Sequence, residues 1–319
     1  MALKLTMTCA EYDRSRALID GTVQARDIDL AIHVNSDDRS RQRDIREGKF
    51  DIGEFFTGIY LADLEYRALG LTAIPIFVKR MFRHSYIYVN KRAGIRSPTD
   101  LHGKRVGVQT WFTTTALWAR GILADEYGVD LSKIDWLANW NEKVGNWQPP
   151  PWLKLEIAPQ GAKMHDLLIA GAIDAGITTE TWAPFGQADN IDFLFPNYAQ
   201  EERAYYRKTG FFPIQHILVI KNEVLEKHPW VAMSLFDAWQ ASKLECYRWL
   251  ERQRVHMTGL WYRSLWEEER KAAGADPYLW GFNKSRAEVD KMLEYAFRQG
   301  LVTRKIPPED MFHSSTLET

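Results

Sequence analysis

Short apolar runs alternate with polar stretches of helical composition along the first third of this 319-residue chain. Helical composition covers residues 11–20 and 37–48, and Gly48 stands where a helix is expected to stop. The apolar runs are residues 3–9, 28–34, 50–56 and 73–78. Alternation of this kind is typical of an open, largely parallel sheet covered by helices, so the chain is predicted to be an α/β protein.

Two regions interrupt the alternation and predict a division into lobes. A strand at 85–90 leads into a stretch rich in turn residues, and a second α/β unit follows it. Near residue 210 begins a strand that is long enough to return to the first unit. Because domains usually hold about 100 to 150 residues, we expect two lobes. Lobe 1 is predicted to comprise residues 1–94 and 213–319, and lobe 2 to comprise residues 95–212.

Charge, hydropathy and cysteine content narrow the class of protein. Lysine plus arginine (41) nearly cancels aspartate plus glutamate (42), so no net field favours nucleic acid or an anionic membrane. No apolar run approaches the ~20 residues that span a bilayer, and the chain starts without the pattern of an export signal. Cys9 and Cys246 lie too far apart for a disulfide framework or a zinc site. A cytoplasmic protein is expected, one that binds neither nucleic acid nor membrane and can form a homo-oligomer.

The motifs of several enzyme classes are missing from the sequence. It contains no glycine-rich dinucleotide or phosphate loop, no His-Glu-x-x-His and no Gly-x-Ser-x-Gly. Nucleotide cofactors and covalent serine chemistry are therefore not predicted, and no spacing of ligands indicates a metal. The expected partner is a small molecule, bound by a local set of side chains.

Open α/β sheets bind ligands beyond the carboxyl ends of their strands, where the next helix presents unpaired backbone N–H groups. Arg14 follows the first strand, Glu54 lies in the third apolar run, and Glu180 follows a short strand of lobe 2. Thr113 and Thr114 begin a predicted helix and offer hydroxyls to a carboxylate, although simple helix capping explains them equally well. These residues are candidates for ligand binding, and Glu54 is also a candidate for acid–base chemistry.

A second group of candidates lies close to the predicted passages between the lobes. Arg80, Arg83 and His84 precede the strand at 85–90, and His216 lies on the returning strand. A guanidinium matches a carboxylate bidentately, and a histidine exchanges protons near neutral pH. Trp111 is one of several lobe 2 tryptophans that can stack on an aromatic ring. Each of these residues also has an ordinary structural explanation, as a solvated arginine, a hydrogen-bonded histidine or a core aromatic.

Four stretches of the sequence carry motifs of known proteins: residues 80–90, 100–109, 117–129 and 212–216. The Asp-Leu-x-Gly-Lys-x-Val-Gly pattern at 100–107 is shared by many solute-binding proteins and indicates the fold alone. The Arg-His-Ser segment, the Leu-Trp-Ala-Arg-Gly-Ile-Leu helix and the Pro-Ile-Gln-His strand indicate a narrower group. With these motifs the chain resembles the 4,5-dihydroxyphthalate decarboxylase family, which lies within the type II periplasmic-binding-protein-like superfamily.

The resemblance implies a two-lobed fold in which the chain crosses between lobes near 88–97 and near 210–217. It also implies cofactor-independent decarboxylation of a hydroxylated, phthalate-like aromatic acid held between the lobes. In this hypothesis arginine and helix N-termini hold the retained carboxylate, while protonated His84 or His216 delivers a proton to the ring and Glu54 assists at the phenol.

Two other functions remain open at this point. The same fold serves non-catalytic proteins that bind or sense a small aromatic or anionic solute. It also serves pyrimidine-forming biosynthetic enzymes, but their cysteine-rich motif is not found in this sequence.

Overall fold

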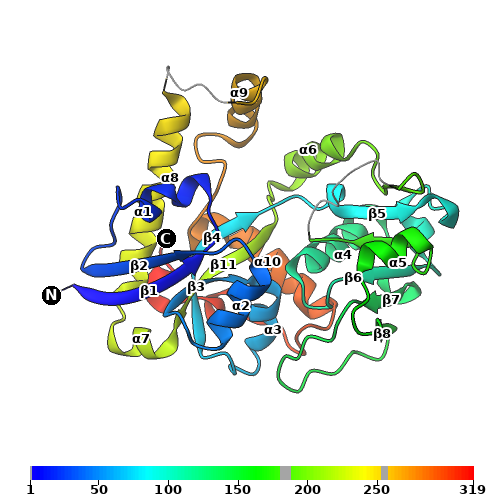
Figure 1. Ribbon diagram of the computed structural model, residues 1–319, viewed down its shortest axis with the longest axis horizontal. Helices are drawn as coiled ribbons and strands as arrows, with labels where there is room; N and C mark the ends of the chain where they lie inside the picture. Colours follow the sequence, from blue (N-terminus) through cyan, green and yellow to red (C-terminus); the bar gives the residue numbers. More distant parts are fainter. Residues whose placement is uncertain (1, 180–187, 253–257) are drawn as a thin grey trace.

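The computed structural model describes residues 2–179, 188–252 and 258–319. Within these residues the strands form two mixed sheets, which lie side by side as the centres of two lobes (Figure 1). The predicted two-lobed α/β architecture is therefore confirmed. No helix in the described part of the chain is long and apolar enough to cross a membrane.

The sheet of lobe 1 has the strand order β2-β1-β3-β11-β4. Its first three strands run parallel, and β11 runs antiparallel to both β3 and β4. Nearly every residue of β11 is buried, as expected for a central strand with an almost continuous apolar sequence. The strands are β1 (Leu3–Cys9), β2 (Ile28–Val34), β3 (Ile52–Phe56), β4 (Leu71–Arg80) and β11 (Ile214–Lys221).

Helices from both ends of the chain cover this sheet. The predicted helix at 11–20 is only a short turn and α1, whereas the predicted helix at 37–48 is α2, capped by the Asp37 side chain. The covering helices are α1 (Arg16–Ile19), α2 (Asp38–Arg46), α3 (Thr57–Asp63), α7 (Asn222–Lys227), α8 (Val231–Glu251) and α10 (Phe282–Arg298). The helix α9 (Tyr262–Ala273) has no buried residue and lies apart from the sheet, beyond the end of α8 (Figure 1).

The sheet of lobe 2 has the strand order β10-β5-β9-β6-β7-β8. The longest of its helices, α4 (Thr114–Tyr127), is buried along most of its length and ends at Gly128, whose positive φ of 68° suits a residue without a side chain. The other helices are α5 (Met164–Ala170) and α6 (Tyr198–Thr209). The strands are β5 (Ile87–Asn90), β6 (Arg105–Val108), β7 (Asp135–Ala138), β8 (Leu155–Ile157), β9 (Ala175–Ile177) and β10 (Ile191–Phe193).

The first crossing between lobes differs from the prediction. We expected residues 88–97 to make it, but β5 pairs with β9 and β10 and is part of the second sheet. The chain therefore crosses at 81–86, directly after β4. A short buried strand has the same apolar pattern in either sheet, so its sequence does not identify its partners. The return crossing, at 210–213 ahead of β11, lies within the predicted stretch 210–217.

The lobes are also joined by close packing away from the crossings. The Gly58 amide of α3 donates to the Thr114 hydroxyl of α4 at 2.9 Å, and a Cβ on Gly58 would lie 2.2 Å from the Phe112 carbonyl oxygen. Glycine thus permits the backbones of the two lobes to meet. Farther along α4, the Arg120 guanidinium donates to the Gln299 side chain at 2.7 Å, which joins lobe 2 to the end of α10.

Candidate functional site

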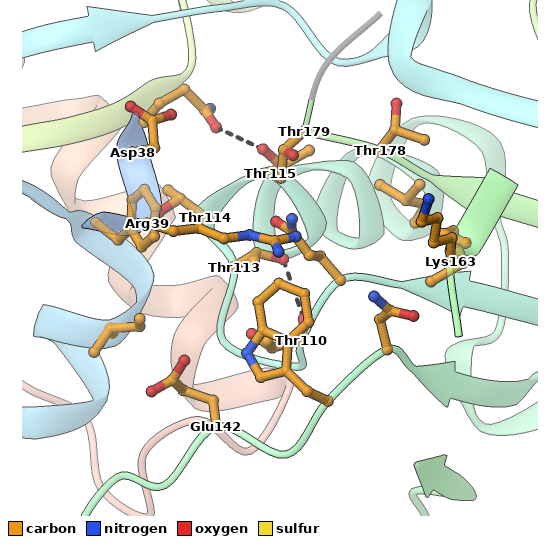
Figure 2. A pocket seen from close by; sticks show the side chains of 18 of the residues that line it. Asp38, Arg39, Thr110, Thr113, Thr114, Thr115, Glu142, Lys163, Thr178 and Thr179 are labelled. Carbon is orange, nitrogen blue, oxygen red and sulfur yellow. Dashed lines mark hydrogen bonds between the residues drawn. The ribbon is translucent and has the colours of Figure 1, made fainter. Parts of the chain in front are cut away.

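A cleft of about 1160 Å³ lies between the two lobes. Lobe 1 lines it with the start of α2 and with the ends of β3 and β4, and lobe 2 with the start of α4 and with segments beside β7, β8 and β9. Figure 2 shows Asp38 and Arg39 of α2 on one side of the cleft and Lys163 on the other. The volume is large enough for a small organic ligand and the water around it.

A buried histidine–glutamate pair forms part of the lobe 1 wall. His216 Nδ1 lies 2.5 Å from Glu54 Oε1, and both side chains are almost completely buried. The pair forms because β11 and β3 are neighbours, with His216 opposite Phe56 and Glu54 opposite Leu218. His216 also lines the cleft. Since Nδ1 is hydrogen-bonded to Glu54, Nε2 is the ring nitrogen available to a ligand.

Glu54 is held as a carboxylate by several donors of lobe 1. Its Oε2 accepts from the Ala10 amide at 2.8 Å, and its Oε1 accepts from the Tyr12 hydroxyl at 2.6 Å and lies 3.1 Å from the Arg41 guanidinium. Burial alone would raise the pKa of Glu54, but the hydrogen bond and charge of His216, together with Arg41, lower it to about 2.

The same surroundings act on His216 in opposite directions. Burial lowers its pKa below the ordinary value of 6.5, while the hydrogen bond and the charge of Glu54 favour the protonated ring. The carboxylate also fixes the tautomer and orientation of the imidazole. This arrangement suits a group that gives a proton to, or takes one from, a ligand in the cleft.

Asp38, Glu54 and His216 place one ligand atom each within 4.8 Å of one another, the spacing of a group that could hold a metal ion. Both oxygens of Glu54 already accept from protein donors, and Asp38 is paired with Arg41 and with Lys79, 3.1 Å away. Two neighbouring cations and fully used acceptors do not suit a divalent cation. The cluster is suited to handling protons.

Arg83 brings a cation to the point where lobe 2 meets the crossing. Its Nε donates to the Met81 carbonyl, its Nη1 donates to the Thr115 hydroxyl at 3.0 Å, and its buried Nη2 has no partner among the described residues. Burial lowers the pKa of Arg83 to about 10, so the group remains charged at neutral pH. Arg83 lines the cleft beside the first turn of α4, where Thr113 and Thr114 also lie. The unpaired Nη2 of Arg83 and the helix N-terminus together suit a carboxylate.

Four predicted site residues lie elsewhere. Arg80 is paired with the buried Glu288 at 2.5 Å and joins β4 to α10. Arg14 donates to the Val78 carbonyl at 2.6 Å and stacks on Tyr278, so its guanidinium is used within lobe 1. Neither arginine lines the cleft, so neither binds a ligand there. Arg80 is also not the solvated arginine of the structural alternative, since it is buried and ion-paired.

His84 and Trp111, two further predicted site residues, also lie outside the cleft. His84 is buried among the rings of lobe 2, with Phe195 at 5.1 Å, Tyr205 at 5.6 Å and Tyr127 at 5.9 Å. Trp111 packs under the Arg120 guanidinium at 3.7 Å and donates to the Gln299 carbonyl, so it is a core residue and does not stack in the cleft. Glu180 lies outside the described residues.

Several residues that line the cleft were not among the candidates. Asp38 and Arg39 lie in the stretch of helical composition at 37–48, and Lys79 directly follows the apolar run at 73–78. Trp140 follows β7, and its ring lies 4.4 Å from the Arg39 guanidinium of the other lobe. The signal that was available is their position: each stands beside the end of a strand or the start of a helix.

Known structures share this two-lobed architecture, which is the type II periplasmic-binding-protein-like fold. The periplasmic aliphatic sulphonate-binding protein SsuA of Escherichia coli matches 100% of this chain and 99% of its own, with a TM-score of 0.51 and 11% identity. The alkanesulfonate-binding protein SsuA of Xanthomonas axonopodis pv. citri, bound to MOPS, matches 99% of this chain and 97% of its own, with a TM-score of 0.52 and 13% identity.

Sequence relatives define the family more narrowly. Residues 23–144 match the family described as NMT1/THI5 like. The 4,5-dihydroxyphthalate decarboxylase of Comamonas testosteroni is 30% identical across 99% of this chain and 98% of its own length. That of Pseudomonas putida is 27% identical across 66% of this chain and 83% of its own length. The chain belongs to the 4,5-dihydroxyphthalate decarboxylase family, as its motifs predicted.

Proposed function

We propose that this protein decarboxylates a hydroxylated, phthalate-like aromatic acid in the cleft between its lobes, without a cofactor. The observation that carries the proposal is His216, a histidine that lines the cleft and is oriented by a buried carboxylate. The family relationship supplies the substrate class, because both curated relatives are 4,5-dihydroxyphthalate decarboxylases.

In the proposed reaction, protonated His216 donates from Nε2 to the ring carbon that bears the departing carboxylate. The bond between this carbon and the carboxylate then breaks, its electron pair returns to the ring, and carbon dioxide leaves. Aromaticity is restored, and neutral His216 regains its proton from water. Glu54 stabilises the protonated imidazole of His216 through Nδ1. This role differs from the one predicted for Glu54 at the phenol of the substrate, because protein donors already occupy the Glu54 oxygens.

The retained carboxylate would be held by Arg83 and the first turn of α4. Arg83 has an unpartnered N–H group beside the helix N-terminus. The Thr110 hydroxyl also lines the cleft without a partner among the described residues, whereas the hydroxyls of Thr113 and Thr115 already donate to the Thr110 carbonyl and the Gln215 side chain. Placing this anion against lobe 2 leaves the other side of the ring facing His216 on lobe 1. Orientation of this kind makes a large contribution to the rate of a reaction on a bound substrate.

The test is to incubate the full chain with 4,5-dihydroxyphthalate and a panel of hydroxybenzoates and to measure carbon dioxide release. His216→Asn should lower turnover by a factor of about 10² to 10⁴, which is typical of a lost general acid. His84→Phe is the matched control, because it also removes a buried histidine but outside the cleft, and it should retain turnover per folded molecule.

The rival function is that of a non-catalytic solute-binding or sensor protein, which the sulphonate-binding relatives of the same fold favour. A thermal-shift screen with the same acids separates the two, since a ligand that binds the folded state raises its apparent stability. Binding of an aromatic acid with no carbon dioxide release across the panel would establish the rival and reject the enzyme.

A further inference from the structure

The proposed reaction requires electron donation from a phenol oxygen of the substrate. The structure places a side chain where it can bind that oxygen, and this side chain was not among the candidates from the sequence. Glu54 cannot serve, because Ala10, Tyr12, Arg41 and His216 occupy its oxygens. The group that faces the cleft beside the histidine is the ammonium of Lys79.

Lys79 and His216 are direct neighbours in the lobe 1 sheet. The register of β11 against β4 pairs His216 with Lys79, and the ladder is irregular on both sides of His216. Opposite residues of an antiparallel pair place their Cβ atoms about 5 Å apart on the same face of the sheet. Irregularities of this kind re-aim side chains and are frequent beside active sites. A single aromatic ring can therefore contact both side chains.

The hydrogen bonds of Lys79 leave it donors for a ligand. Its Nζ donates to Asp38 Oδ2 at 3.1 Å, and no second acceptor is found among the residues that the structure describes. An ammonium has three N–H bonds, so two are free. The Lys79 side chain is 24% exposed, and the exposed part belongs to the cleft wall.

Charged groups on the neighbouring elements keep Lys79 in place. Asp38 of α2 is ionised: burial raises its pKa, but His216, Lys79 and Arg41 outweigh burial and lower it. Arg41 also pairs with Glu54, and both of these side chains are buried. The Asp38 carboxylate therefore orients the Lys79 ammonium. Because Asp38 also pairs with Arg41, its negative charge is divided between two cations and does not fully neutralise Lys79.

We propose that Lys79 binds the phenol oxygen of the substrate as a phenolate and thereby makes a hydroxylated ring a requirement of this site. The inference rests on the proposed function. On binding, the phenol O–H loses its proton to water, and the phenolate pushes electrons to the ring carbon that accepts the proton of His216. When the carbon–carbon bond breaks, its electron pair returns to the phenolate, which Lys79 still holds.

The experiment uses 4-hydroxy-3-nitrobenzoate, whose phenolate is coloured and whose hydroxyl lies para to the carboxylate. Its absorbance is titrated against pH, free and bound to the full chain. Bound to the wild-type protein, its phenol pKa should fall by at least about one unit, the usual effect of an adjacent cation. Lys79→Met should abolish this shift, and Lys79→Arg should retain most of it.

Lys163→Met is the matched control, since it removes a cleft-lining lysine from the lobe 2 side and should leave the shift unchanged. Circular dichroism of each variant checks that the fold is retained. An undiminished shift in folded Lys79→Met would overturn the inference, even where carbon dioxide release is normal. A Lys79-dependent shift without carbon dioxide release from any acid supports the phenolate contact and rejects the decarboxylase.

Discussion

At the scale of single residues, His84 is the histidine that the site does not use. Its two ring nitrogens have no hydrogen-bond partner among the described residues, and burial among aromatic rings lowers its pKa from 6.5 to about 4. The unfolded chain therefore binds a proton at His84 below about pH 6.5, whereas the folded protein binds it only below about pH 4. Between these values, unfolding takes up a proton, so acid destabilises the fold.

We expect the contribution of His84 to stability to be fully present above pH 6.5 and to be lost progressively as the pH falls through about 4. The full loss amounts to roughly 3 kcal/mol. His84→Phe should flatten this part of the profile, as measured by urea unfolding at several pH values between 4 and 7. Equal slopes in His84→Phe and the wild type would contradict the assignment.

Two of the residues that were selected from the sequence, Glu54 and His216, lie together because their strands pair. Their catalytic roles stay predictions. Arg80, Arg83 and His84 were all candidates, yet only Arg83 lines the cleft. Arg80 is the last residue of β4, whereas Arg83 and His84 lie in the turn after it, where no periodicity specifies the direction of a side chain. Lys79 was not selected because its place beside His216 depends on β11, which is distant in sequence.

At the scale of elements, the contact between α4 and α10 depends on one glycine. A Cβ on Gly121 would lie 2.2 Å from the Tyr295 ring. Gly121→Ala should therefore destabilise the protein by about 1 to 3 kcal/mol through overpacking, although alanine is the better helix former. Denaturant unfolding measures the change. In a Tyr295→Leu background the same substitution should cost much less, and an equal cost in both backgrounds would show that the ring is not the obstacle.

Elements of regular structure were predicted well, and their partners less well. The strands expected at 3–9 and 28–34 are β1 (Leu3–Cys9) and β2 (Ile28–Val34), and the helix expected at 37–48 is α2 (Asp38–Arg46). Periodicity identifies such elements because burial of one face repeats locally. Assignment of β5 to lobe 1 was wrong because strand pairing is a long-range property. Trp111, which was expected to stack in the cleft, was likewise misassigned. Its packing against Arg120 is a tertiary contact, which local sequence does not specify.

At the scale of the whole molecule, Gly58 controls how closely the lobes approach. An added Cβ would meet the Phe112 carbonyl oxygen, a backbone atom that cannot rotate away. Gly58→Ala should therefore separate the lobes near Arg83 and α4 and weaken binding of an aromatic acid by about tenfold or more, equivalent to about 1.4 kcal/mol. Calorimetric titration measures the affinity. Gly259→Ala, where the nearest atom to the new Cβ is 3.8 Å away, should bind normally. Unchanged affinity in Gly58→Ala would show that the lobes tolerate separation.

The Gly58 contact also makes one backbone proton a reporter of motion. The Gly58 amide belongs to lobe 1, and its acceptor, the Thr114 hydroxyl, belongs to lobe 2. Its exchange with deuterium from solvent therefore requires the lobes to part at this seam. The exchange rate of this single amide, measured with and without an aromatic acid, would report the rate at which the cleft opens. Comparison of this rate with turnover would show whether opening limits the release of product.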